Sequence, residues 1–146
     1  MAKISRPLPT PTPETQHFWD GCQAGELRLQ RCDDCRDVYF PPRPFCPKCS
    51  SRSISVFPAS GRATLHSYVI NYRPHPAWSE PYAIAAVRLE EGVVMMSNII
   101  DCPQTPEALL LDMPLQVMFV AQSDAITLPL FRPAAVSDSA AQESGR

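Results

Sequence analysis

Six cysteines carry the clearest chemistry in this chain of 146 residues. Four of them form two CxxC pairs, Cys32 with Cys35 and Cys46 with Cys49, and ten residues separate the pairs. Each CxxC turn places two thiolates on one side of a tight loop, so two facing turns complete a tetrahedral S₄ site with metal–sulfur bonds of about 2.3 Å. Four cysteine ligands leave no open coordination position. We therefore predict a structural zinc site, with iron in a rubredoxin-like role as the alternative.

The residue after the second cysteine of such a turn is commonly glycine, because the backbone there takes a positive φ. In this chain the two positions are Arg36 and Ser50. We expect each to cost about 1 kcal/mol of backbone strain. Metal binding in structural zinc sites supplies about 10 kcal/mol or more, which is enough to absorb that cost.

The remaining cysteines, Cys22 and Cys102, stand apart from the cluster. Either can be imagined as a nucleophile with His17, His66 or His75 as its base. No cysteine–histidine pair has an activating sequence context, however, and free cysteine is commonly a small buried hydrophobic residue. We expect both to lie in the core, so catalytic residues are not predicted for this chain.

A helix is predicted over residues 13–25, because Thr12 is a suitable N-cap, proline at the next position suits the first helical turn, and Gly25 ends the pattern. This helix carries Phe18 and Trp19 on its apolar side. The two aromatic residues either pack on the protein's own body or form a helix that docks on a partner.

Proline at alternate positions from 7 to 13 predicts an extended arm over residues 1–12. Residues 134–146 are poor in aromatic and large aliphatic side chains, which predicts a disordered tail. The sequence shows neither the apolar run of a signal peptide nor one long enough to cross a bilayer. We predict a cytoplasmic protein with no membrane partner, where reducing conditions favour metal binding over disulfides.

In the second half of the chain, runs rich in β-branched and aromatic residues predict strands. Three strands, a connection with a helical turn, and two further strands follow the order of a five-stranded OB-type barrel. We therefore predict a mainly β fold with a zinc ribbon over 26–53 and an OB-fold domain over 54–133. The five predicted strands cover residues 61–72, 82–89, 93–100, 115–121 and 126–131.

The loop between the first two of these strands contains Arg73, His75 and Trp78 among several prolines. In OB folds this loop borders the binding face. The three side chains could meet a phosphate and an adenine, rim a protein interface, or simply belong to a stiff exposed loop.

An OB barrel beside a zinc ribbon raises the alternative of a protein that binds single-stranded nucleic acid. Such proteins need a basic surface, because contacts with phosphate release counterions. Residues 53–146 instead carry five basic and nine acidic residues, a net charge of −4. Nucleic acid is therefore an unfavoured partner.

Between Phe18 and Pro133 the chain resembles the DUF35 family of zinc-ribbon and OB-fold proteins. The ribbon segments carry the most specific part of the resemblance, and the strand segments follow in the family's order. The matching segments are FWDGCQAGELRLQRCDDC, FPPRPFCPKC, SGRATLHSYVINYRP, AAVRLEEGVVMMSNI, DMPLQVMF and LPLFRP.

The resemblance implies an N-terminal helix, a rubredoxin-like ribbon whose ligands are the four cysteines, and an OB barrel. It also implies an acyl-CoA setting, in which the small subunit joins a thiolase-fold or hydratase-fold enzyme subunit. Such a subunit supports assembly and borders the CoA channel without supplying the nucleophile. On this basis we expect a non-catalytic accessory subunit, with Arg73, His75 and Trp78 facing CoA or the partner.

One departure from the family pattern lies before the fourth barrel strand. The family commonly has glycine before a Met-Pro pair, whereas this chain has Asp112 before Met113 and Pro114. We expect the turn to use another conformation there.

Overall fold

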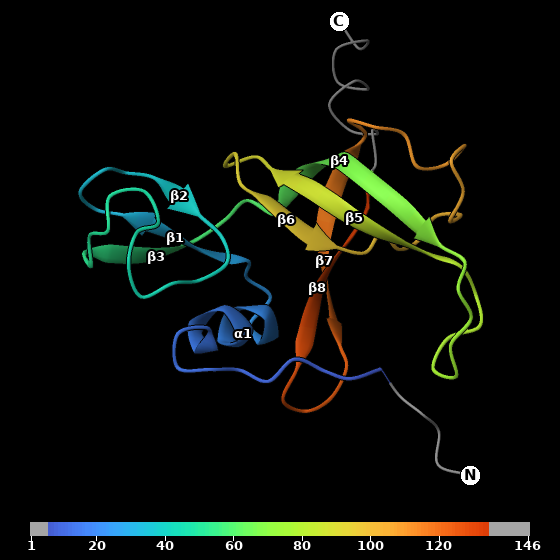
Figure 1. Ribbon diagram of the computed structural model, residues 1–146, viewed down its shortest axis with the longest axis horizontal. Helices are drawn as coiled ribbons and strands as arrows, with labels where there is room; N and C mark the ends of the chain where they lie inside the picture. Colours follow the sequence, from blue (N-terminus) through green and yellow to red (C-terminus); the bar gives the residue numbers. More distant parts are fainter. Residues whose placement is uncertain (1–5, 135–146) are drawn as a thin grey trace, which may run out of the picture.

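One helix and eight strands follow each other along residues 6–134, which are the residues that the computed structural model describes (Figure 1). The first five residues of the expected arm lie outside this range. So does the expected tail over 134–146, except for Ala134. The elements are α1 (Gln16–Gln23), β1 (Arg28–Cys32), β2 (Val38–Tyr39), β3 (Ile54–Pro58), β4 (Arg62–Asn71), β5 (Tyr82–Leu89), β6 (Val94–Ser97), β7 (Pro114–Ala121) and β8 (Thr127–Pro133).

The ribbon forms a small antiparallel sheet in the order β2-β1-β3. Pairing of β3 with β1 runs from Cys32 opposite Ile54 to Arg28 opposite Pro58. The residues from 54 to 58 therefore belong to the ribbon sheet, and not to the barrel in which the sequence placed them. The reason is geometric, because the second cysteine turn sends the chain back alongside β1.

The other five strands form a curled antiparallel sheet in the order β6-β5-β4-β7-β8, which confirms the mainly β, OB-type architecture. A parallel bridge between Ile99 and Phe131 brings the segment after β6 to β8. The Ile100 N–H donates to the Phe131 carbonyl at 2.7 Å, and the Phe131 N–H donates to the Asn98 carbonyl at 3.0 Å. In the long connection the expected helical turn consists of two bonds to the Thr105 carbonyl, from the Ala108 N–H at 3.1 Å and the Leu109 N–H at 3.0 Å.

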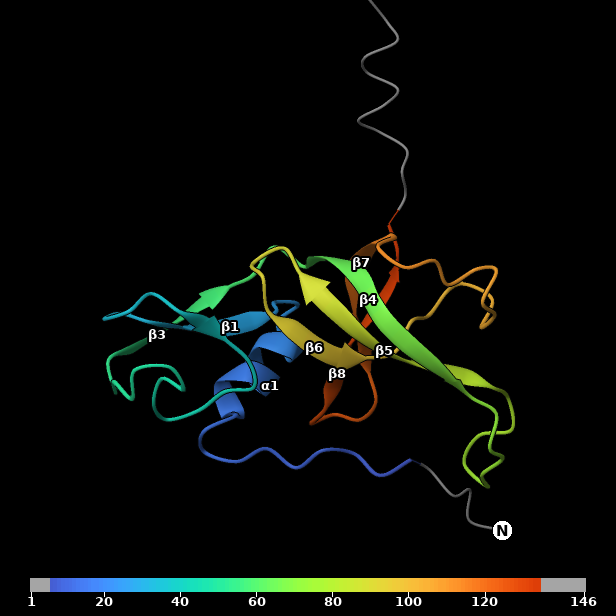
Figure 2. The same cartoon turned by 45° about the horizontal axis from the view of Figure 1, so that its top comes forward.

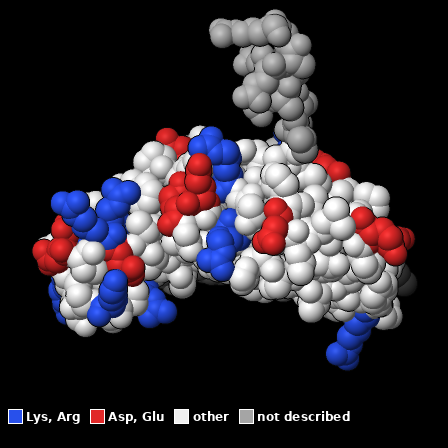
Figure 3. All heavy atoms as spheres, turned by 90° about the horizontal axis from the view of Figure 1, so that it is seen from above, with Lys and Arg blue, Asp and Glu red and all other residues white. Residues whose placement is uncertain are grey.

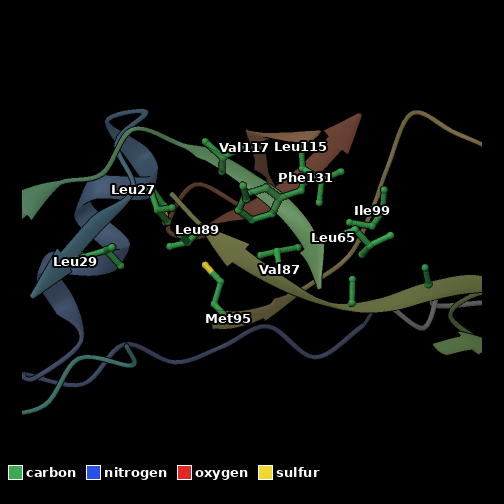
Figure 4. Close-up of a cluster of buried hydrophobic side chains, with 14 of the residues drawn as sticks. Leu27, Leu29, Leu65, Val87, Leu89, Met95, Ile99, Leu115, Val117 and Phe131 are labelled. Atoms are coloured by element: carbon green, nitrogen blue, oxygen red, sulfur yellow. The ribbon is translucent and has the colours of Figure 1, made fainter. Parts of the chain in front are cut away.

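The core lies inside the curled sheet and continues to the helix (Figure 4). Successive side chains of a strand point to opposite faces, so β5 alternates buried residues, among them Val87 and Leu89, with more exposed ones. The ring of Phe131 is fully buried and lies in the middle of the group that Figure 4 shows. Leu27 and Leu29 join the same cluster from the start of the ribbon, together with Phe18 and Cys22 of α1.

The helix begins three residues later than the sequence predicted. Residues 13–15 form a turn, with the Thr15 N–H bonded to the Thr12 carbonyl at 3.0 Å, and Thr15 takes the N-cap position without a side-chain cap. Gly25 ends the helical segment with a φ of 78°. No helix within residues 6–134 is long and apolar enough to cross a membrane.

Three residues adopt a positive φ at positions where similar proteins commonly have glycine. Arg36 and Ser50 have φ of 64° and 65°, which confirms the conformation expected after each cysteine pair. Asp112 has a φ of 65°, so the expectation of another conformation there was wrong. Aspartate tolerates the left-handed region better than most residues, and the Asp112 N–H bonds the Leu65 carbonyl at 2.8 Å.

The change from ribbon to barrel comes at residues 59–61, where the chain is held on both sides. The Ser60 N–H donates to the Glu91 carboxylate at 3.0 Å, and the Gly61 carbonyl accepts from the Val117 N–H at 2.9 Å. Gly61 has a φ of 80°, and a Cβ at this position would lie 2.7 Å from Val117 Cγ1.

Replacing Gly61 with alanine should therefore lower the free energy of unfolding by about 2 to 4 kcal/mol, as the sum of left-handed strain and overpacking. Urea unfolding followed by circular dichroism measures this change. Gly92→Ala is the matched control, because Gly92 has a φ of 95° and open space around its Cβ position. Equal losses in the two variants would contradict the role of the Val117 contact.

Candidate functional site

The four thiols of the ribbon converge as the spacing predicted. Their sulfur atoms all lie within 4.8 Å of one another, and Sγ–Sγ distances are 3.5 Å for Cys32 and Cys49 and 3.6 Å for Cys35 and Cys46. Bonds of about 2.3 Å in a tetrahedron place neighbouring sulfurs about 3.8 Å apart. The donor set and its geometry therefore fit a zinc ion.

The two cysteine turns close with the same backbone hydrogen bond, and they differ in which N–H points to the first sulfur. The Cys35 N–H points to Cys32 Sγ at 3.4 Å, and the Lys48 N–H points to Cys46 Sγ at 3.3 Å. In each turn the residue with positive φ returns its N–H to the carbonyl of the first cysteine, at 2.9 Å. The Cys35 N–H lowers the pKa of the Cys32 thiol to about 7.

The site is closed on its inner side. Cys32 and Cys46 are fully buried against Tyr39, whereas Cys49 lies at the surface. A side chain of the first turn also reaches β3, since Asp33 accepts a hydrogen bond of 2.6 Å from the Ser55 hydroxyl. Because all four ligands are sulfur, the arrangement supports a structural metal and offers no position for a substrate.

The two aromatic residues predicted on the helix have different surroundings. Phe18 is only 4% exposed, and its ring centroid lies 5.1 Å from that of Trp19 and 5.2 Å from that of Phe40. It belongs to the core and has almost no surface left for a partner. Trp19 is partly exposed and lines an apolar cavity between α1, the ribbon, β6 and β8.

The three residues predicted in the loop after β4 do come together. Arg73, His75 and Trp78 line one cavity of about 330 Å³. The rings of His75 and Trp78 are stacked, with centroids 4.0 Å apart. The indole of Trp78 is therefore partly covered by the protein's own imidazole.

Sequence reasoning missed Arg6, which reaches this loop from the N-terminal arm. Its guanidinium lies 4.5 Å from the ring centroid of Trp78 and 4.7 Å from that of Tyr82. Figures 1 and 2 show the arm running from α1 toward the loop between β4 and β5. No local pattern announces this contact, because the residues that meet are far apart in the sequence.

Of the two cysteines outside the ribbon, Cys22 lies in the core as expected, whereas Cys102 is only partly buried and packs against the core. Cys22 is 1% exposed, and burial raises the pKa of its thiol to about 12. Burial also raises the pKa of Cys102, with a further contribution from the carboxylate of Asp101. A thiol with a raised pKa is a poor nucleophile at neutral pH, so the structure gives no support to the alternative of cysteine catalysis.

Charges of both signs mix on the surface. Figure 3 shows basic and acidic side chains intermingled over the ribbon end, and a large part of the barrel surface on this face without charge. Single-strand binders instead line their grooves with basic residues that follow the phosphates. The pattern on this face is not of that kind.

Replacing Cys46 with serine should remove one buried ligand and leave the ribbon without metal and unfolded, because structural zinc sites supply about 10 kcal/mol or more of folding free energy. Elemental analysis of the purified protein and dispersion of the ribbon amide signals in NMR spectra measure these effects. Cys102→Ser is the control and should keep one zinc ion per chain. A metal-free Cys46→Ser protein with an intact ribbon would contradict the structural role, and iron in the wild type would overturn the metal assignment.

Comparison with known proteins gives matches to both parts of the chain. The model for the family described as "ChsH2, rubredoxin-like zinc ribbon domain" matches residues 19–55. The model described as "ChsH2, C-terminal OB-fold domain" matches residues 57–120. The ribbon match covers all four cysteines, which supports zinc as the metal that they hold.

Relatives and a solved structure extend these matches. The chain is 32% identical over 133 residues to a probable enoyl-CoA hydratase alpha subunit of Thermomonospora curvata, covering 90% of this chain but only 41% of that protein. It is 34% identical over 93 residues to a DUF35 domain-containing scaffold protein of Methanothermobacter thermautotrophicus, covering 61% of this chain and 70% of that protein. A chain of the structure named Ltp2-ChsH2(DUF35) aldolase aligns with a TM-score of 0.77 and 30% identity, over 88% of this chain and 100% of that one. From its ribbon, its barrel and the extent of these matches, the chain belongs to the DUF35 family.

Proposed function

We propose that the chain is a non-catalytic accessory subunit of a thiolase-superfamily acyl-CoA enzyme, where it supports assembly and borders the CoA channel. One observation carries the proposal: the chain matches the whole of a chain from a structure named as an Ltp2-ChsH2(DUF35) aldolase. The names of other relatives, a hydratase alpha subunit and a scaffold protein, are consistent with it. A hydratase-fold subunit is the alternative partner.

The chemistry of the described residues supports an accessory role. The metal site has a full set of four sulfur ligands, and the thiols of Cys22 and Cys102 have raised pKa values. A covalent mechanism would need an activated nucleophile next to a base. The catalytic groups are therefore expected on the partner.

The loop after β4 is the proposed contact with CoA or with the partner. Arg73 offers a guanidinium suited to phosphate, and His75 and Trp78 share its cavity. Because Trp78 is stacked on His75, its role in this proposal is to hold the imidazole in place, and adenine stacking would have to use another surface. On α1, the proposed docking contact rests on Trp19, since Phe18 is buried.

The first test is purification of the tagged full-length chain from cells of its source under gentle conditions, followed by mass spectrometry and assays with CoA thioesters. We expect a thiolase-fold or hydratase-fold enzyme in a fixed ratio to the chain, and turnover by the complex but not by the chain alone. Cys46→Ser bait should lose the partner, while Cys102→Ser bait should keep it. Turnover by the isolated wild-type chain, or a wild-type bait without such a partner, would refute the proposal.

A second test concerns the loop. Arg73→Ala in the complex should raise the KM for a CoA thioester about tenfold and leave kcat nearly unchanged, because one charge-assisted contact with phosphate is removed from bound and transition states alike. Arg62→Ala is the matched control, since Arg62 is an exposed arginine at the opposite end of β4, paired with Glu90. Unchanged KM in Arg73→Ala would remove this loop from the CoA path.

A further inference from the structure

Two cavities adjoin along the seam of the barrel, the first between the edge strands β6 and β8 and the second between β8 and the segment that follows β6. The first has a volume of about 230 Å³ and the second about 300 Å³. Asn98 and Leu130 line both cavities, so the two are neighbours with a shared wall, and we call them together the seam groove. Their combined size falls in the range of about 300 to 1,000 Å³ that is common for small-molecule sites.

The seam is open because the two edge strands do not pair with each other there. Strand β6 pairs with β5, and β8 pairs with β7. The Ser97 hydroxyl crosses the seam to the Pro129 carbonyl at 2.9 Å, and the bridge between Ile99 and Phe131 follows. The groove therefore lies where the two edges of the sheet meet to close the barrel.

One end of the seam groove is apolar. The lining of the first cavity contains no charged side chain, and it combines residues of α1, the ribbon, β6 and β8. Met96 is 64% exposed there, and Trp19 is partly exposed. Large apolar side chains left open in a concave surface mark a site for an apolar group.

The other end carries a cation, Arg6, that has no anionic partner among residues 6–134. Arg6 lines the second cavity, and its guanidinium is held over the rings of Trp78 and Tyr82. Residues 6–134 contain two salt bridges, Arg28 with Glu26 and Arg62 with Glu90, and neither involves Arg6. A guanidinium that lies over aromatic rings keeps N–H groups at its edge for a carboxylate.

The polar lining around Arg6 is fixed by the fold. Gln104 accepts a hydrogen bond of 2.7 Å from the Ala83 N–H, and Asn98 donates one of 2.7 Å to the Ala83 carbonyl. The carboxylate of Asp101 also lines this cavity but forms no salt bridge with Arg6. It should therefore weaken the attraction for an anion without cancelling it.

We propose that the seam groove binds an amphipathic anion, with its apolar tail against Trp19 and Met96 and its carboxylate at Arg6. This site differs from the metal centre and from the loop cavity that contains Arg73. It shares Trp19 with the proposed docking contact on α1, but its test uses the isolated chain, so the outcome does not depend on the presence of an enzyme partner.

Calorimetric titration of the zinc-loaded full chain with dodecanoate and with dodecyltrimethylammonium, both below the concentrations at which they aggregate, tests the proposal. The two probes share a tail and differ in the charge of the head. We expect one dodecanoate per chain, bound at least about tenfold more tightly than the cationic probe. Trp19 fluorescence in a Trp78→Phe background should shift to shorter wavelength as the tail covers the indole.

Variants separate the two ends of the groove. Arg6→Ala should lower the affinity for dodecanoate about tenfold and should not weaken binding of the cationic probe, because the removed charge repels an ammonium head group. Asp101→Asn should raise the affinity for dodecanoate. Met96→Ser should weaken both probes, and Leu111→Ser is its matched control because Leu111 is 62% exposed and lies outside the groove. Binding without saturation, equal affinity for the two probes, or no effect of Arg6→Ala would overturn the proposal. So would equal losses in Met96→Ser and Leu111→Ser.

Discussion

The convergence of four thiolates on one point is the constraint on which the ribbon depends. The ribbon has a core of its own that consists of Cys32, Cys46 and Tyr39, with few neighbours. Burial of so little apolar surface cannot offset the entropy of ordering two turns and three short strands. Bonds to a metal ion supply the missing free energy, and they also hold Arg36 and Ser50 in backbone conformations that cost about 1 kcal/mol each.

The order imposed at the metal extends into the rest of the molecule through β1. This strand ends at Cys32, and three residues earlier Leu29 enters the main core beside α1. Phe40, from the ribbon, packs on Phe18 of the helix and also lines the seam groove. The ribbon, the helix and the barrel therefore pack against one another, and the seam groove forms only when all three are folded.

The sequence predicts what depends on local spacing and alternation, and it fails where distant segments meet. The ten-residue separation of the cysteine pairs was enough to place the ligands, and the run of β-branched and aromatic residues over 82–89 was enough to place β5. Strand β1 escaped prediction because its pattern, with Leu29 and Gln30 both buried, does not alternate. Asp112 was misjudged because glycine's conformation was treated as closed to aspartate. No pattern in the sequence predicts the contact of Arg6 with Trp78, because it forms only when the arm has folded along the barrel.

The parallel bridge between Ile99 and Phe131 has a consequence for the order of folding during synthesis. All ribbon strands and all four thiols have been made once the ribosome passes Pro58, and their contacts are close in sequence. The barrel core, in contrast, cannot close before β8 has been synthesised, because Phe131 belongs to that strand. Non-local closure of this kind is slow and leaves apolar strands uncovered in the meantime. A nascent chain of this protein is therefore expected to hold a finished metal module while its barrel still needs protection from aggregation.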